Sequence, residues 1–483
     1  MEPACSHFFP AGNWMNDPCG LVHHNGVYHL FYQYNPSGTR WGNIHWGHAI
    51  SRDLCRWEDM GIALAPHPKF GHPFTGSVVP EPGTGRLVAL LTAATPKPGG
   101  VWHQQQAVAV SSDGGFRWEW HPGPPVIPNP GVPDFRDPRV VRLEDEGLWM
   151  MALSAGDRVL FYRSQDLFSW ESAGEFGAEY PEHRGVWECP DLIDFGPGQP
   201  PEERWLLLFS IGEGLPGGLG AVHYVFGSCD AGGFRPAAAR GAAGDSVPKT
   251  PNGSLPVRTL DAGPDFYAFQ SWTEDPRQLP MPPEDPVGIA WANNYAYAHT
   301  VVPRPGEANG VLTIPRRLSV LRTDDGPMVA SRPAVAPGGV PGARVPSATP
   351  GAWGPPEAKA LSWDVLTWYR WDEADGRAGG SGGGRPRELV FREGDRVLLT
   401  LGIDCRRREV RVRREESSWG PALEGYAFEK TAEGPPEGPR GTGDRFDLLV
   451  QRGLVELFAF DGGVTVTVRL YPEKPALSLT TRA

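Results

Sequence analysis

Three carboxylic acids of the sequence stand in short, turn-prone segments that contain aromatic residues. They are Asp17 in WMNDP (14–18), Asp137 in FRDP (135–138) and Glu188 in WECPD (187–191). Cleavage of a glycosidic bond needs two such groups, one to attack or shield the cationic sugar centre and one to protonate the leaving oxygen. Residue types alone do not say which acid has which role. Because Asp before Pro is also common turn chemistry, it is the set of three that predicts glycoside hydrolysis.

Short apolar segments between turn residues supply the elements that would position these acids. The clearest lie at 27–34, 45–50, 87–91, 106–111, 148–154 and 205–211. Their length and their content of Val, Leu, Phe, Tyr and Trp predict β-strands and therefore an all-β fold. The prolines after Asp17 and Asp137 disfavour helix, so we expect an extended strand end at each of these acids.

Three segments repeat one pattern, in which an apolar strand leads into a turn with Ser and then a Trp. They read AISRDLCRW (49–57), VSSDGGFRW (110–118) and YRSQDLFSW (162–170). This recurrence predicts blades of a β-propeller, with Trp118 and Trp170 packed within the blades. Chance similarity between hairpins of a β-sandwich is the alternative. Inner strands of a propeller converge on a central funnel, so acids from successive blades can meet there.

A change in composition divides the chain into two domains. Residues 1–330 carry the acids and the repeats, and 331–358 are rich in Pro, Gly and Ala without strand alternation, as in a linker. Residues 359–483 again alternate apolar and polar side chains, which predicts an antiparallel β-sandwich. The sequence therefore predicts a propeller, a linker and a sandwich.

The charge of the chain bears on its partners. The net charge of −12 is spread along 483 residues and includes no basic stripe that could neutralise phosphates. We therefore expect a small-molecule partner and neither nucleic acid nor an anionic membrane. No stretch of 18 apolar residues occurs.

The cysteines and the N-terminal residues bear on localisation. The six cysteines form no CxxC pair and no regular spacing, which predicts reduced thiols and neither a zinc site nor a disulfide framework. The first residues, MEPACSH, lack the basic and apolar regions of a signal peptide. From these two observations we expect a cytoplasmic protein.

Ordered motifs along most of the chain resemble glycoside hydrolase family 32, the invertase, inulinase and levanase group. The segments that carry the resemblance are 7–57, FTGS (74–77), FRDP (135–138), WECP (187–190), DAGPDFYAFQSW (261–272), WANNYAYA (291–298) and 446–472. The resemblance implies a five-bladed β-propeller followed by a β-sandwich, without a metal or organic cofactor. It implies a retaining, exo-acting β-fructofuranosidase acting on sucrose and short fructans through a covalent fructosyl-enzyme.

The same resemblance assigns roles to residues of this chain. Asp17 would be the nucleophile, Glu188 the acid and then the base, and Asp137 the residue that stabilises the transition state. The residues it implies for fructose binding are Asn16, Gln33, Trp41, Phe74, Thr75, Arg136 and Asp261. A retaining mechanism requires the two catalytic carboxyl groups to lie about 5 to 5.5 Å apart. It also requires different pKa values, and we expect Trp187 and Cys189 to give Glu188 an apolar setting.

Departures from the family pattern leave alternatives open. Cys19 stands where the family usually has Asn, and Tyr295 stands where a Trp is often found. A fructosyltransferase, in which sucrose instead of water intercepts the intermediate, is therefore an alternative, although Cys19 is also explained as a small buried residue. Further alternatives are a carbohydrate-binding propeller without catalysis, and a five-bladed hydrolase of arabinan or xylan, a group that lacks the C-terminal sandwich.

Overall fold

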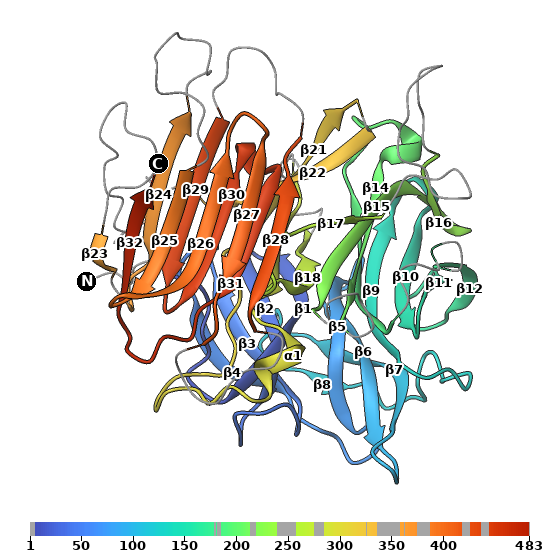
Figure 1. The fold of residues 1–483 in the computed structure, drawn as a ribbon. Helices are drawn as coiled ribbons and strands as arrows, with labels where there is room; N and C mark the ends of the chain where they lie inside the picture. The colour runs from blue at the N-terminus through green and yellow to red at the C-terminus, as the bar shows by residue number, and fades with distance from the viewer. Residues whose placement is uncertain are drawn as a thin grey trace.

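The computed structural model describes most of the chain. The described residues are 5–177, 180, 185–212, 219–238, 257–274, 285–324, 326–335, 358–361, 363–373, 387–417, 426–435 and 444–482. Over these ranges the fold is almost entirely β, as predicted, and α1 (Tyr295–Ala298) is the one α-helix (Figure 1). Single 3₁₀ turns occur at Glu144–Glu146, Pro201–Glu203 and Phe460–Gly462. No helix within the described ranges is long and apolar enough to cross a membrane.

Five antiparallel sheets of four main strands form the first domain. Blade I contains β1 (Trp14–His24), β2 (Val27–Asn35), β3 (His45–Ser51) and β4 (Glu58–Leu64). Blade II contains β5 (His72–Pro80), β6 (Leu87–Pro96), β7 (Trp102–Ser111) and β8 (Glu119–Trp120). Blade III contains β9 (Phe135–Leu143), β10 (Leu148–Ala155), β11 (Val159–Ser164) and β12 (Glu171–Phe176).

Blades IV and V complete the propeller. Blade IV contains β13 (Trp187–Asp194), β14 (Trp205–Ile211), β15 (Ala221–Asp230) and β16 (Gly233–Pro236), and β17 (Arg258–Thr259) pairs with β15. Blade V contains β18 (Tyr267–Ser271), β20 (Val287–Trp291), β21 (Arg316–Thr323) and β22 (Gly326–Pro333). The strands predicted from apolar segments are the second and third strands of the blades.

The first and last blades are joined, which closes the ring. The inner strands β1, β5, β9, β13 and β18 neighbour one another in cyclic order. The short strand β19 (Thr273–Glu274) follows β18 and pairs in parallel with β1, with Val22 opposite Thr273. The N-terminal segment adds a second link, because the backbone N–H of Leu312 donates to the carbonyl of Phe8 at 3.1 Å.

The repeated Ser and Trp pattern forms the turn after the third strand of blades I to III. In each turn an Asp carboxylate accepts one hydrogen bond from the hydroxyl of the Ser two residues earlier. It also accepts hydrogen bonds from backbone N–H groups that follow the Asp. These pairs are Ser51 with Asp53, Ser111 with Asp113 and Ser164 with Asp166, at 2.9 to 3.1 Å. Trp118 and Trp170 donate from Nε1 to the carbonyls of Gly115 and Leu167 in the same turns. The tryptophans are therefore part of the blades, as predicted.

Each inner strand is also interrupted by a shift in its pairing register. Five of these shifts, one in each inner strand, lie between Met15 and Pro18, Pro73 and Gly76, Arg136 and Arg139, Glu188 and Asp191, and Tyr267 and Gln270. In β1 a further shift lies between Cys19 and Val22. A bulge bends the strand and redirects a side chain. At three of the five bulges a residue other than glycine has a left-handed backbone, namely Asp137 (φ 65°), Cys189 (φ 48°) and Ala268 (φ 52°).

The backbone at Asp137 differs from the sequence-based expectation. An extended strand end was predicted there from the following proline, but the residue is left-handed because the bulge determines its conformation. Its N–H donates to Thr92 Oγ1 of the neighbouring blade at 2.9 Å, and the N–H of Ala268 donates in the same way to Ser210 Oγ at 3.0 Å. Hydroxyl groups on second strands thus stabilise the bulges.

Two sheets form the C-terminal sandwich (orange to red in Figure 1). One sheet has the order β23 (Ala358–Leu361), β32 (Leu477–Arg482), β25 (Arg387–Glu393), β26 (Arg396–Asp404), β27 (Glu409–Arg414) and β28 (Phe428–Glu433). The other has the order β24 (Thr367–Glu373), β29 (Asp444–Gln451), β30 (Leu454–Ala459) and β31 (Val464–Arg469). Their facing side chains share one apolar core.

The predicted end of the first domain can be compared with the last strand of blade V. The predicted end of the propeller at residue 330 lies inside β22, which continues to Pro333. The predicted linker at 331–358 falls mainly on residues 336–357, which lie outside the described residues.

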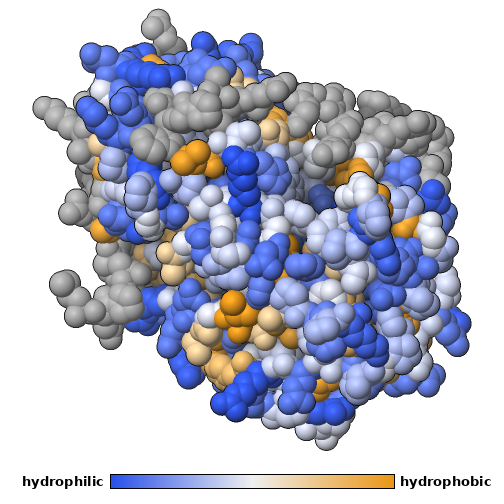
Figure 2. Space-filling view, turned by 90° about the horizontal axis from the view of Figure 1, so that it is seen from below, coloured by the Kyte–Doolittle hydropathy of each residue, from blue (hydrophilic) through white to orange (hydrophobic). Residues whose placement is uncertain are grey.

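The face seen from below in Figure 2 is mostly polar, with apolar side chains in small groups.

A disulfide bond corrects the prediction of reduced thiols. Cys5 and Cys55 are bonded, and the Cα atoms are 4.6 Å apart. The backbone N–H of Ser6 donates to the carbonyl of Cys55 at 3.1 Å, so the N-terminal segment is fastened to the turn after β3. The pairing was missed because 50 residues separate the cysteines in the sequence. Cys19, Cys189 and Cys229 are free thiols.

Candidate active site

The inner strands of the propeller surround a pocket of about 480 Å³. Its lining comes from blades I to IV and from α1 with the residue after it, in the connection between β20 and β21 of blade V. The lining residues are Asp17, Gln33, Trp41, Phe74, Trp102, Gln104, Asp134, Arg136, Asp137, Val186, Glu188, Gly212, Tyr295 and His299. The three predicted acids therefore meet in one volume, although they are far apart in the sequence.

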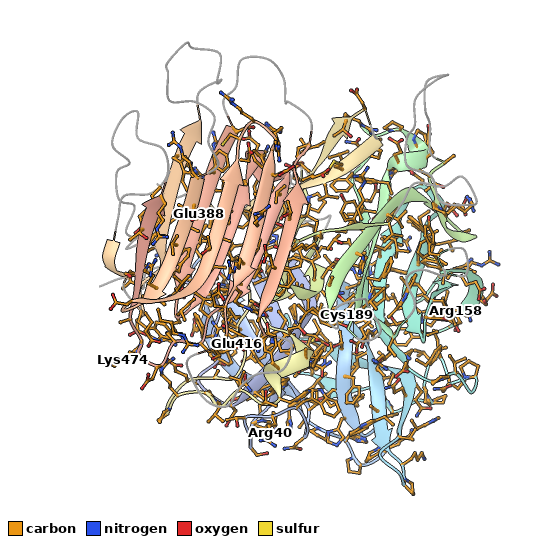
Figure 3. All side chains as sticks on the ribbon, in the orientation of Figure 1. Arg40, Arg158, Cys189, Glu388, Glu416 and Lys474 are labelled. Carbon is orange, nitrogen blue, oxygen red and sulfur yellow. A yellow bond between two sulfur atoms is a disulfide. The ribbon has the colours of Figure 1, made fainter. Side chains whose placement is uncertain are left out.

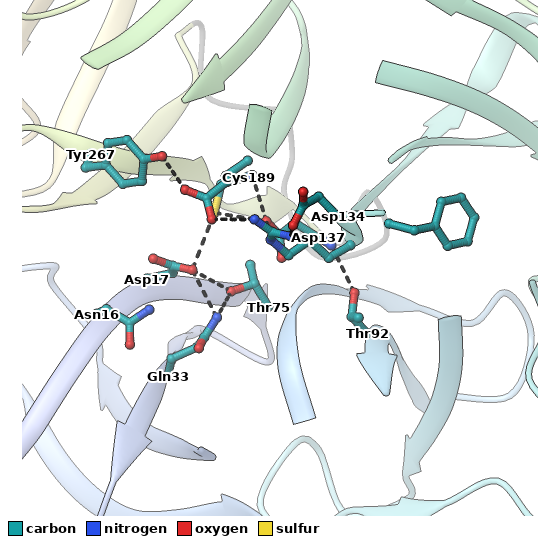
Figure 4. Close-up of polar contacts among 12 residues, drawn as sticks. Asn16, Asp17, Gln33, Thr75, Thr92, Asp134, Asp137, Cys189 and Tyr267 are labelled. Atoms are coloured by element: carbon teal, nitrogen blue, oxygen red, sulfur yellow. Dashed lines mark hydrogen bonds and ion pairs between the residues drawn. The ribbon is translucent and has the colours of Figure 1, made fainter. Parts of the chain in front are cut away.

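Asp17 of β1 is held by one carboxylate oxygen only (Figure 4). Its Oδ2 accepts from Gln33 Nε2 at 3.0 Å and from Thr75 Oγ1 at 2.8 Å. Its Oδ1 has no hydrogen-bond partner among the described residues. Burial, and then the charge of Glu188, raise the pKa of Asp17 to about 6. The fixed Oδ2 orients the side chain and leaves Oδ1 free to react.

Asp137 of β9 lies in the same cluster, with an almost fully buried side chain. The backbone N–H of Cys189 donates to its Oδ2 at 3.0 Å. Burial raises the pKa of Asp137 to about 7, because the charges of Asp17 and Glu188 add to it while Arg136 opposes them. A carboxyl group held in this way can bind the hydroxyl groups of a sugar.

Glu188 of β13 is held by two polar side chains. Arg136 Nη2 donates to its Oε1 at 2.9 Å, and the hydroxyl of Tyr267 donates to its Oε2. Tyr267 was missed, although it lies in the segment DAGPDFYAFQSW (261–272) that carries the family resemblance, because only Asp261 of that segment was considered. Arg136 also pairs with Asp134.

The apolar setting predicted for Glu188 is not what the structure shows. Cys189, labelled in Figures 3 and 4, places its Sγ 3.5 Å from Asp17 Oδ2 and 3.6 Å from Asp137 Oδ2. Trp187 is fully buried and stacks on Phe209, with the ring centroids 3.9 Å apart. Successive residues of a strand point to opposite sides, so neighbours in sequence need not be neighbours in the site.

The structure brings six of the seven predicted fructose-binding residues to the pocket or directly behind it. Gln33, Trp41, Phe74 and Arg136 line the pocket. Thr75 contacts Asp17 from behind. Asn16 is fully buried, accepts from Trp14 Nε1 and donates from Nδ2 to the hydroxyl of Tyr295 at 2.9 Å. Asn16 therefore positions Tyr295, a lining residue that replaces the usual Trp.

Asp261 is the exception, and its assignment to the sugar site is corrected. Its Oδ2 accepts from Arg316 Nη1 and from Thr467 Oγ1, each at 2.8 Å. Its Oδ1 accepts the backbone N–H groups of Gly263 and Thr467. Thr467 belongs to the sandwich, so Asp261 joins the two domains. The motif identified an important Asp, but not the direction of its side chain.

Cys19 does not line the pocket. It is fully buried and packs against Phe31, Trp46 and Val78 in an apolar cluster. Burial raises the pKa of its thiol far above the usual range. This supports the simpler of the two explanations, a small buried residue.

The arrangement as a whole is suited to one chemistry. A funnel that holds buried carboxyl groups, a free carboxylate oxygen and an aromatic wall can bind a sugar and cleave its glycosidic bond. Among the described residues no group of His, Cys, Asp and Glu is arranged to hold a metal ion. The fold and the site together are those of a glycoside hydrolase.

Comparison with known proteins identifies the family. Residues 7–333 match the family model described as Glycosyl hydrolases family 32 N-terminal domain. The chain belongs to glycoside hydrolase family 32, as the sequence motifs indicated.

Similar proteins extend the match to both domains. The chain is 35% identical over 483 aligned residues to a levanase of Bacillus subtilis (strain 168), which covers 98% of this chain and 67% of the levanase. It is 30% identical to an extracellular exo-inulinase of Aspergillus ficuum, over 98% of this chain and 90% of that protein. The crystal structure of an exo-inulinase from Aspergillus awamori superposes with a TM-score of 0.75 at 26% identity, covering 99% and 95% of the two chains.

Proposed function

We propose that this protein is a retaining, exo-acting β-fructofuranosidase that releases fructose from sucrose and from short fructans. The observation that carries the proposal is the free Oδ1 of Asp17 in the same pocket as Glu188, which Arg136 and Tyr267 hold in place. Relatives named levanase, exo-inulinase and invertase support fructosides as the substrate class.

In the proposed first step, Asp17 Oδ1 attacks the anomeric carbon of fructose while Glu188 donates its proton to the departing oxygen. The bond to the leaving group breaks, and a covalent fructosyl-enzyme forms. In the second step Glu188 removes a proton from water, the water oxygen attacks the same carbon, and Asp17 leaves as a carboxylate. Asp137 would bind fructose hydroxyl groups throughout. The separation of about 5 to 5.5 Å between the two carboxyl groups stays a prediction.

The shape of the site favours action at a chain end. The acids lie at the convergence of the inner strands, with Asp17 and Asp137 only 5% and 3% exposed. A pocket of this kind admits a terminal sugar, whereas cleavage inside a polymer needs an open cleft.

The test is the release of glucose and fructose from concentrated sucrose by the wild type, Asp17→Asn and Glu188→Gln. Equal amounts of both sugars, lost in both variants, are the expected result for a hydrolase. Glucose in excess of fructose would instead indicate a fructosyltransferase. Binding of sucrose without any release would indicate a carbohydrate-binding propeller.

Localisation is a separate question. The N-terminal residues led us to expect a cytoplasmic protein, and this stays a prediction. The disulfide between Cys5 and Cys55 favours an oxidising compartment instead, because cytosolic thiols are kept reduced. Fractionation of the native cells, with thiol labelling of the purified protein, distinguishes the two.

A further inference from the structure

The pocket contains a glutamine that the proposed chemistry does not use. Gln104 of β7 lines the pocket and is 6% exposed. Its Oε1 has no hydrogen-bond partner in the part of the chain that the structure describes. A buried polar group without a partner costs about 1 to 3 kcal/mol. The amide is therefore placed to receive a donor from a ligand, and sugar hydroxyl groups are such donors.

Gln104 continues the aromatic wall of the pocket outwards. Trp102 precedes it by two residues on β7, so both side chains lie on the same face of blade II. The Trp102 ring meets Phe74 and Trp41, with centroids 5.1 and 5.8 Å apart. These are the two predicted walls of the fructose site. Because β7 is the third strand of its blade, Gln104 lies about 10 Å, or two strand spacings, from the inner strand. This distance places it beyond the sugar that Asp17 would attack.

A series of contacts connects the strand of Gln104 to Glu188. Glu188 is held by Arg136, and Arg136 pairs with Asp134. The loop before Asp134 is fastened to β7, because Asn129 Nδ2 donates to the backbone carbonyl of Gln104 at 2.8 Å. Gln104 and Glu188 therefore line one pocket and are linked through the segment that carries Arg136. The leaving group, which receives the proton of Glu188, would depart within this pocket.

We infer that Gln104 accepts a hydrogen bond from a hydroxyl of the leaving-group sugar, a neutral hexose ring packed against Trp102. Gln104 is then a specificity-determining residue that ranks substrates by their leaving group. The inference rests on the proposed fructosidase function and deepens it. It assigns a role to a residue that carries no catalytic step.

The experiment compares two substrates that share fructose and differ in the leaving group. Sucrose has a hexose there, and methyl β-D-fructofuranoside has only a methyl group. Gln104→Leu should lower kcat/KM for sucrose by about tenfold, the effect of one neutral hydrogen bond, and leave kcat/KM for the methyl fructoside unchanged. The ratio of the two values does not depend on the fraction of folded enzyme, so a partly unfolded variant still gives an answer.

The neighbouring glutamine provides the matched control. Gln105 is on the same strand, points to the opposite face and is half-buried, so Gln105→Leu should change neither substrate. An equal loss on both substrates in Gln104→Leu, or no loss on sucrose, would overturn the inference alone. A wild type that cleaves neither substrate would overturn the proposed function and this inference with it.

Discussion

Two buried clusters of carboxylates differ in how completely their oxygens are satisfied. In the interface cluster, Asp261 and Glu456 share Arg316, and all of these side chains are fully buried. Glu456 Oε1 accepts from Arg316, and its Oε2 accepts the backbone N–H of Ile314 and contacts His7. Every carboxylate oxygen of this cluster has a partner. In the active site, Asp17 Oδ1 has none among the described residues.

The pKa values follow the same division. Burial raises the pKa of Glu456, but Arg316 and His7 outweigh burial, so the net shift is downwards. At Asp17 burial and the charge of Glu188 act together and raise the pKa to about 6. A fully paired cluster stabilises the fold, whereas a buried oxygen without a partner lowers the stability of the folded state and is available to a ligand. The predictions below test this distinction.

The largest expected difference is in turnover. Asp17→Asn should lower kcat on sucrose on the order of 10⁴-fold or more, because it removes the attacking group. Asp261→Asn should keep the wild-type kcat for each folded molecule, since Asp261 does not line the pocket. Initial rates, corrected for the folded fraction by circular dichroism, measure both. A matching loss of kcat in Asp261→Asn would mean that the interface cluster takes part in the reaction.

The next effect is on stability. Arg316→Met should destabilise the fold by about 3 to 5 kcal/mol, because Asp261 and Glu456 would remain buried without their cation. The control is Arg317→Met on the same strand, because Arg317 is only partly buried and makes a weak contact to the Asp285 carbonyl. The midpoints of urea unfolding measure the difference in stability between the two variants, provided that the dependence of the unfolding free energy on urea is the same for both. Equal midpoints for the two variants would contradict the assignment.

A smaller change in the free energy of unfolding is expected for Asp17→Asn, and it is a gain in stability where Arg316→Met gives a loss. Its pKa is higher in the folded state than the ordinary 3.8, so folding is most favoured below that value and loses stability as the pH rises through about 6. Asp17→Asn removes this loss and should stabilise the inactive enzyme by about 1 to 3 kcal/mol at pH 7. Thermal unfolding at pH 7 and pH 4 measures it, and the gain should disappear at the lower pH. A gain that persists at pH 4 would exclude titration of Asp17 as its cause.

The smallest effect concerns the pH dependence of the rate. The reaction needs an ionised Asp17, so kcat/KM should fall by about tenfold for each pH unit below about 6. Asp261→Asn should show the same fall of kcat/KM below about pH 6, because the interface cluster is separate from the active site. Initial rates between pH 4 and 8 on sucrose measure the profile. A flat profile down to pH 4 would show that Asp17 titrates lower than its surroundings indicate.

The sequence predicted the middle strands of the blades better than the inner ones. The apolar segments at 27–34 and 205–211 correspond to β2 (Val27–Asn35) and β14 (Trp205–Ile211). The inner strands were identified only as motifs, because they contain prolines, buried polar groups and left-handed residues such as Asp137. These features violate the rules of a regular strand at the place where the site is built.

Within the site, the sequence identified the acids but not the direction of every side chain. Asp17, Asp137 and Glu188 meet as expected, whereas Asp261 points into the domain interface. Gln104 was missed, because nothing in its local sequence distinguishes a lining residue from a core residue. The disulfide was missed for a related reason, since only the fold brings Cys5 to Cys55.

The five bulges have a consequence for which side chains reach the site. Asp137, Cys189 and Ala268 share a left-handed backbone at corresponding bulges of blades III, IV and V. Asp137 lines the pocket and Cys189 places its Sγ 3.5 Å from Asp17 Oδ2, whereas Ala268 carries only a methyl group. Ala268 is fully buried in an apolar cluster and does not line the pocket. The same left-handed backbone therefore presents a carboxyl group to the site at one bulge and a methyl group to the core at another.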